Sequence, residues 1–120
     1  MPTKKLDFLR QIVNVELAEK NVSAKVSDIV KGLVSSAEDK YGFSTFGGNP
    51  SKLADYLMSG EFEDVMKVLI SNGYYNVLMS ILNKIVEVYV DDVRVVEAAK
   101  IALEKSGKIK QEVEKQFKKK

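Results

Sequence analysis

The chain has no histidine, no cysteine and no tryptophan among its 120 residues. Without an imidazole or a thiol it lacks the side chains that most often serve as general base, transition-metal ligand and soft nucleophile. The absence of cysteine also excludes a disulfide framework and agrees with a cytoplasmic protein. We therefore expect a binding protein rather than an enzyme, with no catalytic residue, no metal site and no cofactor.

Long apolar runs are missing as well. A membrane-spanning helix needs about 20 consecutive apolar residues, but the longest apolar stretch, 74–90, is interrupted by asparagine, serine, lysine and glutamate. Near the N-terminus Lys4 and Lys5 are followed by further charged and polar residues rather than by the apolar core of a secretory signal. We accordingly expect a cytoplasmic protein with no membrane partner.

The residues that are present have the composition of a globular domain. Hydrophobic residues make up 45% of the chain and charged residues 30%, and 120 residues are too few to divide into two separate cores. Apolar residues recur every three or four positions, which is the period of an amphipathic helix and not of a strand. The sequence therefore predicts an all-α fold, a compact single-domain bundle of five to seven helices.

Turn and capping residues set the expected limits of these helices. Asn72-Gly73 and Asp91-Asp92 separate three of them, and Gly60 is expected to end a short helix that starts at Pro50. The helix over 74–90 has the widest apolar arc, so we expect it to be central. The predicted helices span 4–20, 23–41, 50–60, 61–71, 74–90 and 93 to about 107, and Gly42–Pro50 is the predicted loop.

Two further expectations concern which residues face the core. Val22, Val26, Ile29, Val30, Leu33, Val34, Ala37 and Tyr41 are expected on the apolar face of the second helix, and Val93, Val96, Ala99, Ala102 and Leu103 on that of the last. All acidic residues fall on predicted polar faces or at helix starts, where solvation and the helix dipole explain them. Gly107 is expected to end or kink the last helix, which divides the chain into a bundle domain, 1–107, and a basic amphipathic C-terminal segment, 108–120.

The charge distribution is uneven. Residues 105–120 hold seven lysines against Glu112 and Glu114, a net charge of +5, so the remaining residues sum to −3 within the total of +2. A basic end of this kind favours an anionic partner, although a solubilising tail has the same composition.

Nucleic acid is the anionic partner that these residues favour most. Lysine ammonium groups neutralise phosphates, and tyrosine rings stack on the bases of single strands. Because the chain has only Arg10 and Arg94 for reading base edges, we expect contacts with the backbone of single-stranded RNA or DNA and no sequence specificity. The predicted nucleic-acid-binding residues are Lys105, Lys108, Lys110, Lys115, Lys118, Lys119, Lys120 and Tyr75.

A stripe in the C-terminal segment supports a different function. Ile109, Val113 and Phe117 recur every four residues, a spacing that places them on one narrow helix face. That face either packs on the chain's own bundle or binds other protein subunits, in which case the chain is an adaptor or a viral structural protein that also forms homo-oligomers. The richness in lysine, glutamate, valine and isoleucine is typical of a thermophilic source.

The middle of the chain carries a family resemblance. An apolar helix over 65–71 ends at Asn72-Gly73, a second apolar stretch over 74–79 follows at once, and an alanine- and leucine-containing stretch comes later at 97–103. In these features the chain resembles the small all-helical subunit of type III CRISPR effector complexes. The resemblance implies a part in antiviral defence, in which such subunits stack along the effector filament and hold target RNA through basic surfaces.

Overall fold

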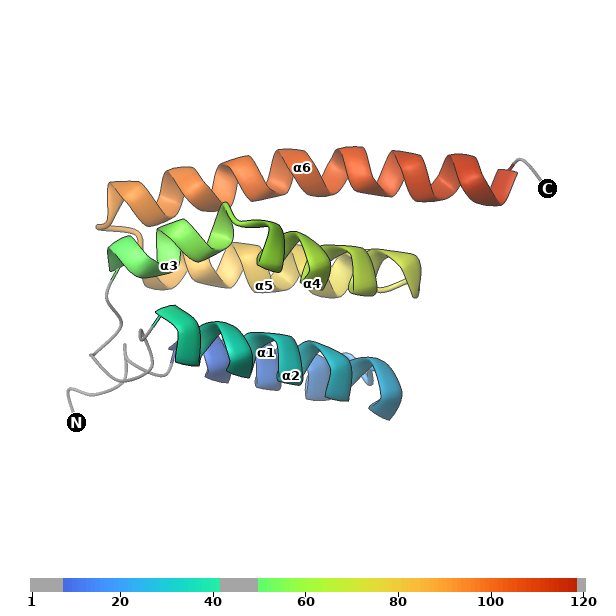
Figure 1. Ribbon diagram of the computed structural model, residues 1–120, viewed down its shortest axis with the longest axis horizontal. Coiled ribbons are helices and arrows are strands. Elements are labelled where there is room, and N and C mark those ends of the chain that lie inside the picture. The colour runs from blue at the N-terminus through green and yellow to red at the C-terminus, as the bar shows by residue number, and fades with distance from the viewer. Residues whose placement is uncertain (1–7, 42–49, 119–120) are drawn as a thin grey trace.

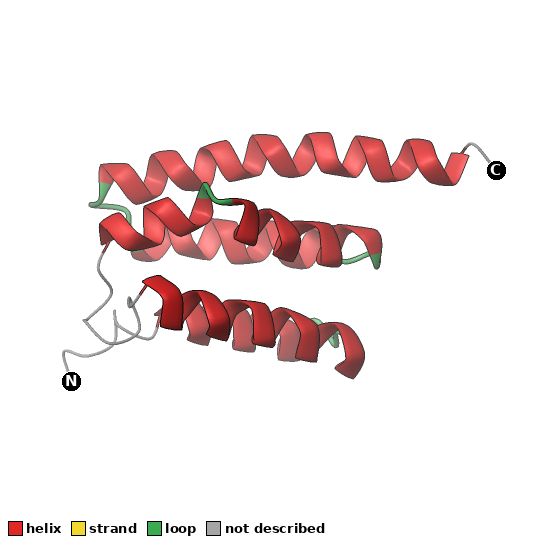
Figure 2. Cartoon of the chain, in the orientation of Figure 1, coloured by secondary structure: helices red, strands yellow, loops and turns green. Residues whose placement is uncertain are grey.

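The computed structural model describes residues 8–41 and 50–118, and in this part of the chain every regular element is a helix (Figure 2). The predicted all-α bundle is therefore confirmed, with a helix count inside the expected range. The helices are α1 (Phe8–Glu19), α2 (Ala24–Tyr41), α3 (Pro50–Leu57), α4 (Gly60–Ser71), α5 (Tyr75–Val88) and α6 (Val93–Lys118). None of the described helices combines the length and the apolar character needed to cross a membrane.

The helices form three layers (Figure 1). Helices α1 and α2 make one outer layer, α3, α4 and α5 make the middle layer, and α6 lies alone on the other side. Helix α6 contacts all three middle helices, and α4 contacts α2, α3, α5 and α6. The expectation that the 74–90 helix is central holds only in part, because α5 contacts α1, α4 and α6 and thus has fewer neighbours than α4.

The core follows the predicted apolar faces closely in α4. Apolar residues recur at helical spacing over 61–71, which predicts an inner face of five residues, and all five are buried, namely Phe62, Val65, Met66, Leu69 and Ile70. Beside them the Tyr56 ring is fully buried and meets the Phe62 ring edge-to-face, with centroids 5.3 Å apart and planes at 68°. Such pairs add directional contact energy to the burial of two large apolar rings.

The helix limits at Asn72-Gly73 and at Asp91-Asp92 agree with the capping signals, whereas the limit at Gly60 does not. Asn72 and Gly73 end α4 as expected, with Gly73 at a φ of +86°, the left-handed region that glycine adopts at low cost. Asp92 Oδ1 accepts a hydrogen bond from the Val95 amide at the start of α6 (3.3 Å), also as expected. Gly60 was expected to end a helix but begins α4, because the Ser59 hydroxyl accepts from the Phe62 amide (3.3 Å) as its N-cap.

Two predicted core positions are wrong. Ile29 is 44% exposed, since the apolar arc of α2 is wider than the surface that its neighbours cover. Val93 is 68% exposed, whereas Val95 and Ala98 are buried, because α6 turns the face containing these two residues toward α3, α4 and α5.

The C-terminal segment is helical in continuity with the bundle. Helix α6 does not end at Gly107 but runs on to Lys118. Other sequence expectations lie outside the described residues, among them the 4–7 part of the first predicted helix, the Tyr41 side chain and the 42–49 part of the predicted loop.

Candidate nucleic-acid interface

Helix α6 positions most of the residues predicted to bind nucleic acid. Its 26 residues correspond to about 39 Å of helix, and Figure 1 shows it extending past the end of the bundle where α4 meets α5. Lys105, Lys108, Lys110, Lys115 and Lys118 belong to this helix. Tyr75 is the first residue of α5, and Lys119 and Lys120 lie outside the described residues.

These lysines do not share one face of α6. At 100° per residue, Lys108 and Lys115 fall on the edge opposite the buried face, and both side chains are exposed. Lys105 is half-buried to one side of this edge, and Lys110 is half-buried on the far side, against α5. Of the four predicted lysines whose side chains are described, only Lys108 and Lys115 are therefore exposed.

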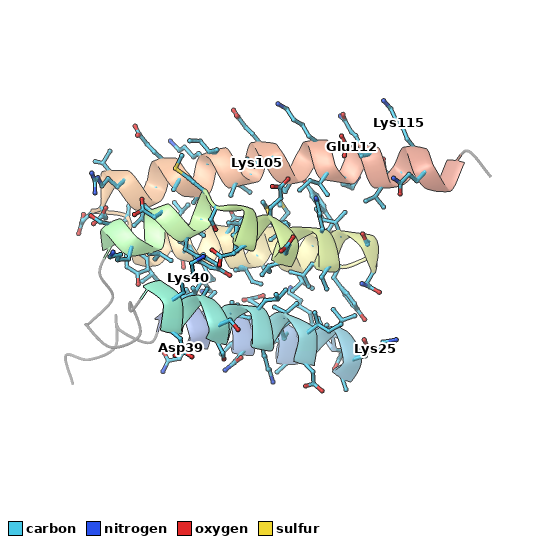
Figure 3. The ribbon with its side chains drawn as sticks, in the orientation of Figure 1. Lys25, Asp39, Lys40, Lys105, Glu112 and Lys115 are labelled. Carbon is cyan, nitrogen blue, oxygen red and sulfur yellow. The ribbon has the colours of Figure 1, made fainter. Side chains whose placement is uncertain are left out.

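The exposed edge of α6 alternates in charge. Reading along the helix, its exposed charged residues are Arg94, Glu97, Lys100, Glu104, Lys108, Glu112 and Lys115. Figure 3 shows oxygen and nitrogen tips alternating along this edge, with Lys115 near its C-terminal end. Opposite charges three or four residues apart on a helix attract one another. Over most of its length, positive and negative side chains therefore alternate along this edge and offset one another. A positive surplus develops only beyond Glu114.

Lys110 and Tyr75 are brought together, but they bind each other. The Lys110 ammonium lies 5.2 Å from the centre of the Tyr75 ring and donates a hydrogen bond to Glu114 Oε2 (2.9 Å). That hydrogen bond, followed by the charge of Glu114, raises the pKa of Lys110 above its ordinary value, while desolvation acts weakly in the opposite direction. One face of the Tyr75 ring is thus covered by a cation of the same chain, which leaves less of it for base stacking.

The apolar stripe of the C-terminal segment packs on its own bundle as far as Val113. Ile109 is buried (7% exposed), and the half-buried Val113 packs against the core. Next to Tyr75 a hollow of about 270 Å³ remains between the α4–α5 turn and α6, lined by Ile70, Gly73, Tyr75, Lys110, Val113 and Glu114. The Phe117 side chain is not among those described.

One acidic residue contradicts the expectation that all of them are solvated. Glu16 of α1 is 6% exposed. Its position carried a signal, because it lies four residues after Ile12 and seven after Leu9, which is the apolar period of α1. Among the described residues no three carboxylates are grouped closely enough to hold a metal ion.

Comparisons with known proteins identify no relative of this chain. No family model, no curated protein and no solved structure matches this chain. The resemblance to the small subunit of type III CRISPR effector complexes therefore stays a prediction made from the sequence.

Proposed function

We propose that the protein is a non-enzymatic subunit of a larger complex that contacts the backbone of single-stranded nucleic acid with the projecting end of α6. The observation that carries this proposal is the position of the lysine surplus. Helix α6 extends past the end of the bundle where α4 meets α5, and the lysine surplus belongs to the C-terminal end of the sequence. The resemblance to a subunit that holds target RNA supports the same function.

The geometry limits which residues take part. Lys108 and Lys115 are exposed and seven residues apart, which is about 10 Å along the helix. Lys118, Lys119 and Lys120 extend the basic stretch in sequence. Lys110 and Tyr75 contribute little, since each is already in contact with the other. Glu112 lies between the two exposed lysines and repels phosphate, so binding is weak and depends strongly on salt.

The test is the salt dependence of binding to a uridine or thymidine oligonucleotide, followed by fluorescence anisotropy. Contacts with about four phosphates predict a slope of about −3 in a plot of log affinity against log salt. Replacing Lys108 and Lys115 by glutamine should lower this slope by about 1.4. Replacing Lys25 and Lys31, two exposed lysines of α2, is the matched control and should leave the slope unchanged. Salt-insensitive binding, or equal effects of both pairs, contradicts the proposal.

A second test removes one negative charge from the exposed edge of α6. Glu112→Gln removes the repulsion between the two exposed lysines and should raise affinity about two- to five-fold. Glu97→Gln removes an exposed carboxylate near the other end of the same edge and should have no effect. If both variants raise affinity equally, the gain comes from net charge and not from a contact at the C-terminal end of α6.

An exposed apolar seam favours a second function, assembly with other protein subunits or with further copies. Met58 is 50% exposed and Ile101 39% exposed, on the two sides of a hollow of about 260 Å³ between α3 and α6. Ala54 and Ala98 also line this hollow, together with the charged residues Asp55, Arg94 and Glu97. Light scattering at rising protein concentration without nucleic acid tests this function. Self-association that is lost in the Met58→Ser/Ile101→Ser variant supports it, and a constant monomer mass contradicts assembly into homo-oligomers.

A further inference from the structure

One carboxylate oxygen inside the bundle receives no hydrogen bond from the described residues. Glu16 is 6% exposed and is the only buried acidic residue of the described part of the chain. Its Oε1 is closed off from solvent and receives no hydrogen bond from any described residue. A buried carboxylate is tolerated when a donor or a positive charge meets it, so this position calls for a partner group.

Glu16 belongs to the wall of a hollow between α1 and α5. The hollow has a volume of about 240 Å³ and is lined by Gln11, Ile12, Val15, Glu16, Lys84 and Val88. Three of these residues are aliphatic, and Val15 is 49% exposed, so the hollow opens to solvent at its rim. An acidic group beside an aliphatic wall suits a ligand with a positive head and an apolar stem.

Lys84 is the only positively charged residue that lines the hollow, and its ammonium group forms an ion pair with Glu87. Its ammonium group lies 3.3 Å from Glu87 Oε1, and its side chain is 54% exposed. A second positive charge at the rim disfavours a ligand with two ammonium groups. The hollow therefore favours a ligand with a single positive charge.

We propose that the hollow binds the side chain of a lysine presented by a partner protein. A rotation of the Glu16 side chain that turns Oε1 toward the hollow lets the ammonium group pair with the carboxylate, and the four-carbon stem packs on Ile12, Val15 and Val88. This site does not depend on the nucleic-acid proposal, because α1 and α6 make no contact with each other.

The experiment is a titration of the full chain, followed by amide NMR shifts, with Nα-acetyl-lysine methylamide. The norleucine analogue, which has the same stem without the ammonium group, is the matched ligand. We expect saturable shifts confined to residues 11–16 and 84–88 for the lysine compound, with a dissociation constant of about 1 mM or above, and none for the norleucine compound. Equal binding of the two compounds overturns the proposal.

Variants identify the carboxylate as the binding group. Glu16→Gln should weaken binding by about ten-fold or more, whereas Glu19→Gln, an exposed glutamate of the same helix, should not change it. If Glu16→Gln fails to fold, Val15→Trp serves instead, since a larger side chain at the exposed rim occupies the hollow and the variant keeps the carboxylate. Unchanged binding in a folded Glu16→Gln or Val15→Trp variant overturns the proposal.

Two further measurements test whether the positive charge comes from a free polyamine or from the chain's own Lys84. Cadaverine, a diamine of similar length, should bind more weakly than the lysine compound, and tighter binding would assign the site to a free polyamine instead. Lys84→Gln should leave binding of the lysine compound unchanged or stronger. Binding that is absent in the wild type and emerges only in Lys84→Gln would mean that the chain's own Lys84 satisfies Glu16, which overturns the proposal.

Discussion

At the scale of single residues, burial changes the protonation of the Tyr89 side chain. Tyr89 at the end of α5 is 5% exposed, and its burial, followed by the nearby negative charge of Asp92, raises its pKa from 10.0 to about 12. Both effects disfavour the phenolate. The folded state therefore binds this proton more tightly than the unfolded state does.

The first prediction is a loss of stability at high pH that depends on Tyr89. Because the folded pKa lies above the unfolded value, the contribution of the neutral phenol is complete below pH 10 and falls as the pH rises toward 12. Between these values the wild type should lose up to about 1.4 kcal/mol per pH unit relative to Tyr89→Phe. Urea unfolding of both proteins from pH 9 upward measures this difference. The same lysines titrate in both proteins, so their contribution to the difference cancels. Parallel stability curves would contradict it.

The second prediction concerns the stability cost of Glu16. Replacing it by methionine removes a buried acceptor that has no donor among the described residues and keeps a side chain of similar length. We expect the free energy of unfolding to rise by about 1–3 kcal/mol. Glu19→Met on the exposed face of α1 should change it by less than about 0.5 kcal/mol. A destabilised Glu16→Met protein would show that the carboxylate has a donor in solution.

At the scale of the elements, the ends of the helices depend on a few local hydrogen bonds. The Ser59 hydroxyl caps α4, and after α4 the Tyr74 amide donates back to the Leu69 carbonyl (2.8 Å) around Gly73. Gly73 has a positive φ, whereas Gly32 lies inside α2 with open space where a Cβ would be. The same substitution should therefore have opposite effects at these two glycines.

The third prediction is this pair of glycine substitutions. Gly73→Ala forces a Cβ into the left-handed region and should lower the free energy of unfolding by about 1–2 kcal/mol. Gly32→Ala restricts the unfolded chain without a clash and should raise it by about 0.5–1 kcal/mol. Thermal and urea unfolding of the two single variants measures both values. Destabilisation by Gly32→Ala would mean that the exposed side of α2 is in contact with other groups.

At the scale of the whole molecule, α6 closes one side of the bundle by itself. It packs on α3, α4 and α5 at once, and its buried face continues past Gly107 to Ile109. The C-terminal segment therefore contributes to the core and also carries the lysine surplus. Its two parts should respond differently to truncation.

The fourth prediction compares two truncations. Deleting residues 108–120 removes the buried Ile109 and the half-buried Val113, so it should cost about 2–5 kcal/mol of stability. Deleting residues 114–120 leaves this apolar contact intact and should cost less than about 1 kcal/mol. Urea unfolding of both proteins measures the difference. Equal stability would mean that the bundle ends near Gly107, as the sequence suggested.

Much of the fold could be predicted from the sequence because helix formation and termination are local. The inner face of α4, its end at Gly73 and the Asp92 cap of α6 all follow from residues within one or two turns. The errors occurred where distant elements decide the outcome. Ile29 remains exposed because no described helix covers that part of α2, and Val93 because α6 turns another face toward its neighbours. The error at Gly60 is the exception, because the Ser59 cap that places Gly60 in the next helix is a local feature.

The candidate site was less predictable than the fold for the same reason. The sequence identified the lysine surplus of the C-terminal segment, since charge can be counted. It could not show that Lys110 meets Tyr75 from a helix 35 residues away, or that Glu16 lies against α5. Such contacts depend on how α1, α5 and α6 are rotated against one another.

By itself, then, the sequence determined an all-α bundle without imidazole or thiol chemistry, because apolar spacing and composition act within a few residues of the chain. Only the tertiary structure decided which lysines face solvent, which ring is covered and which carboxylate is enclosed. Packing sets these outcomes, because the rotation of each helix is chosen by the apolar surface of its neighbours, and the charged residues on it follow that rotation.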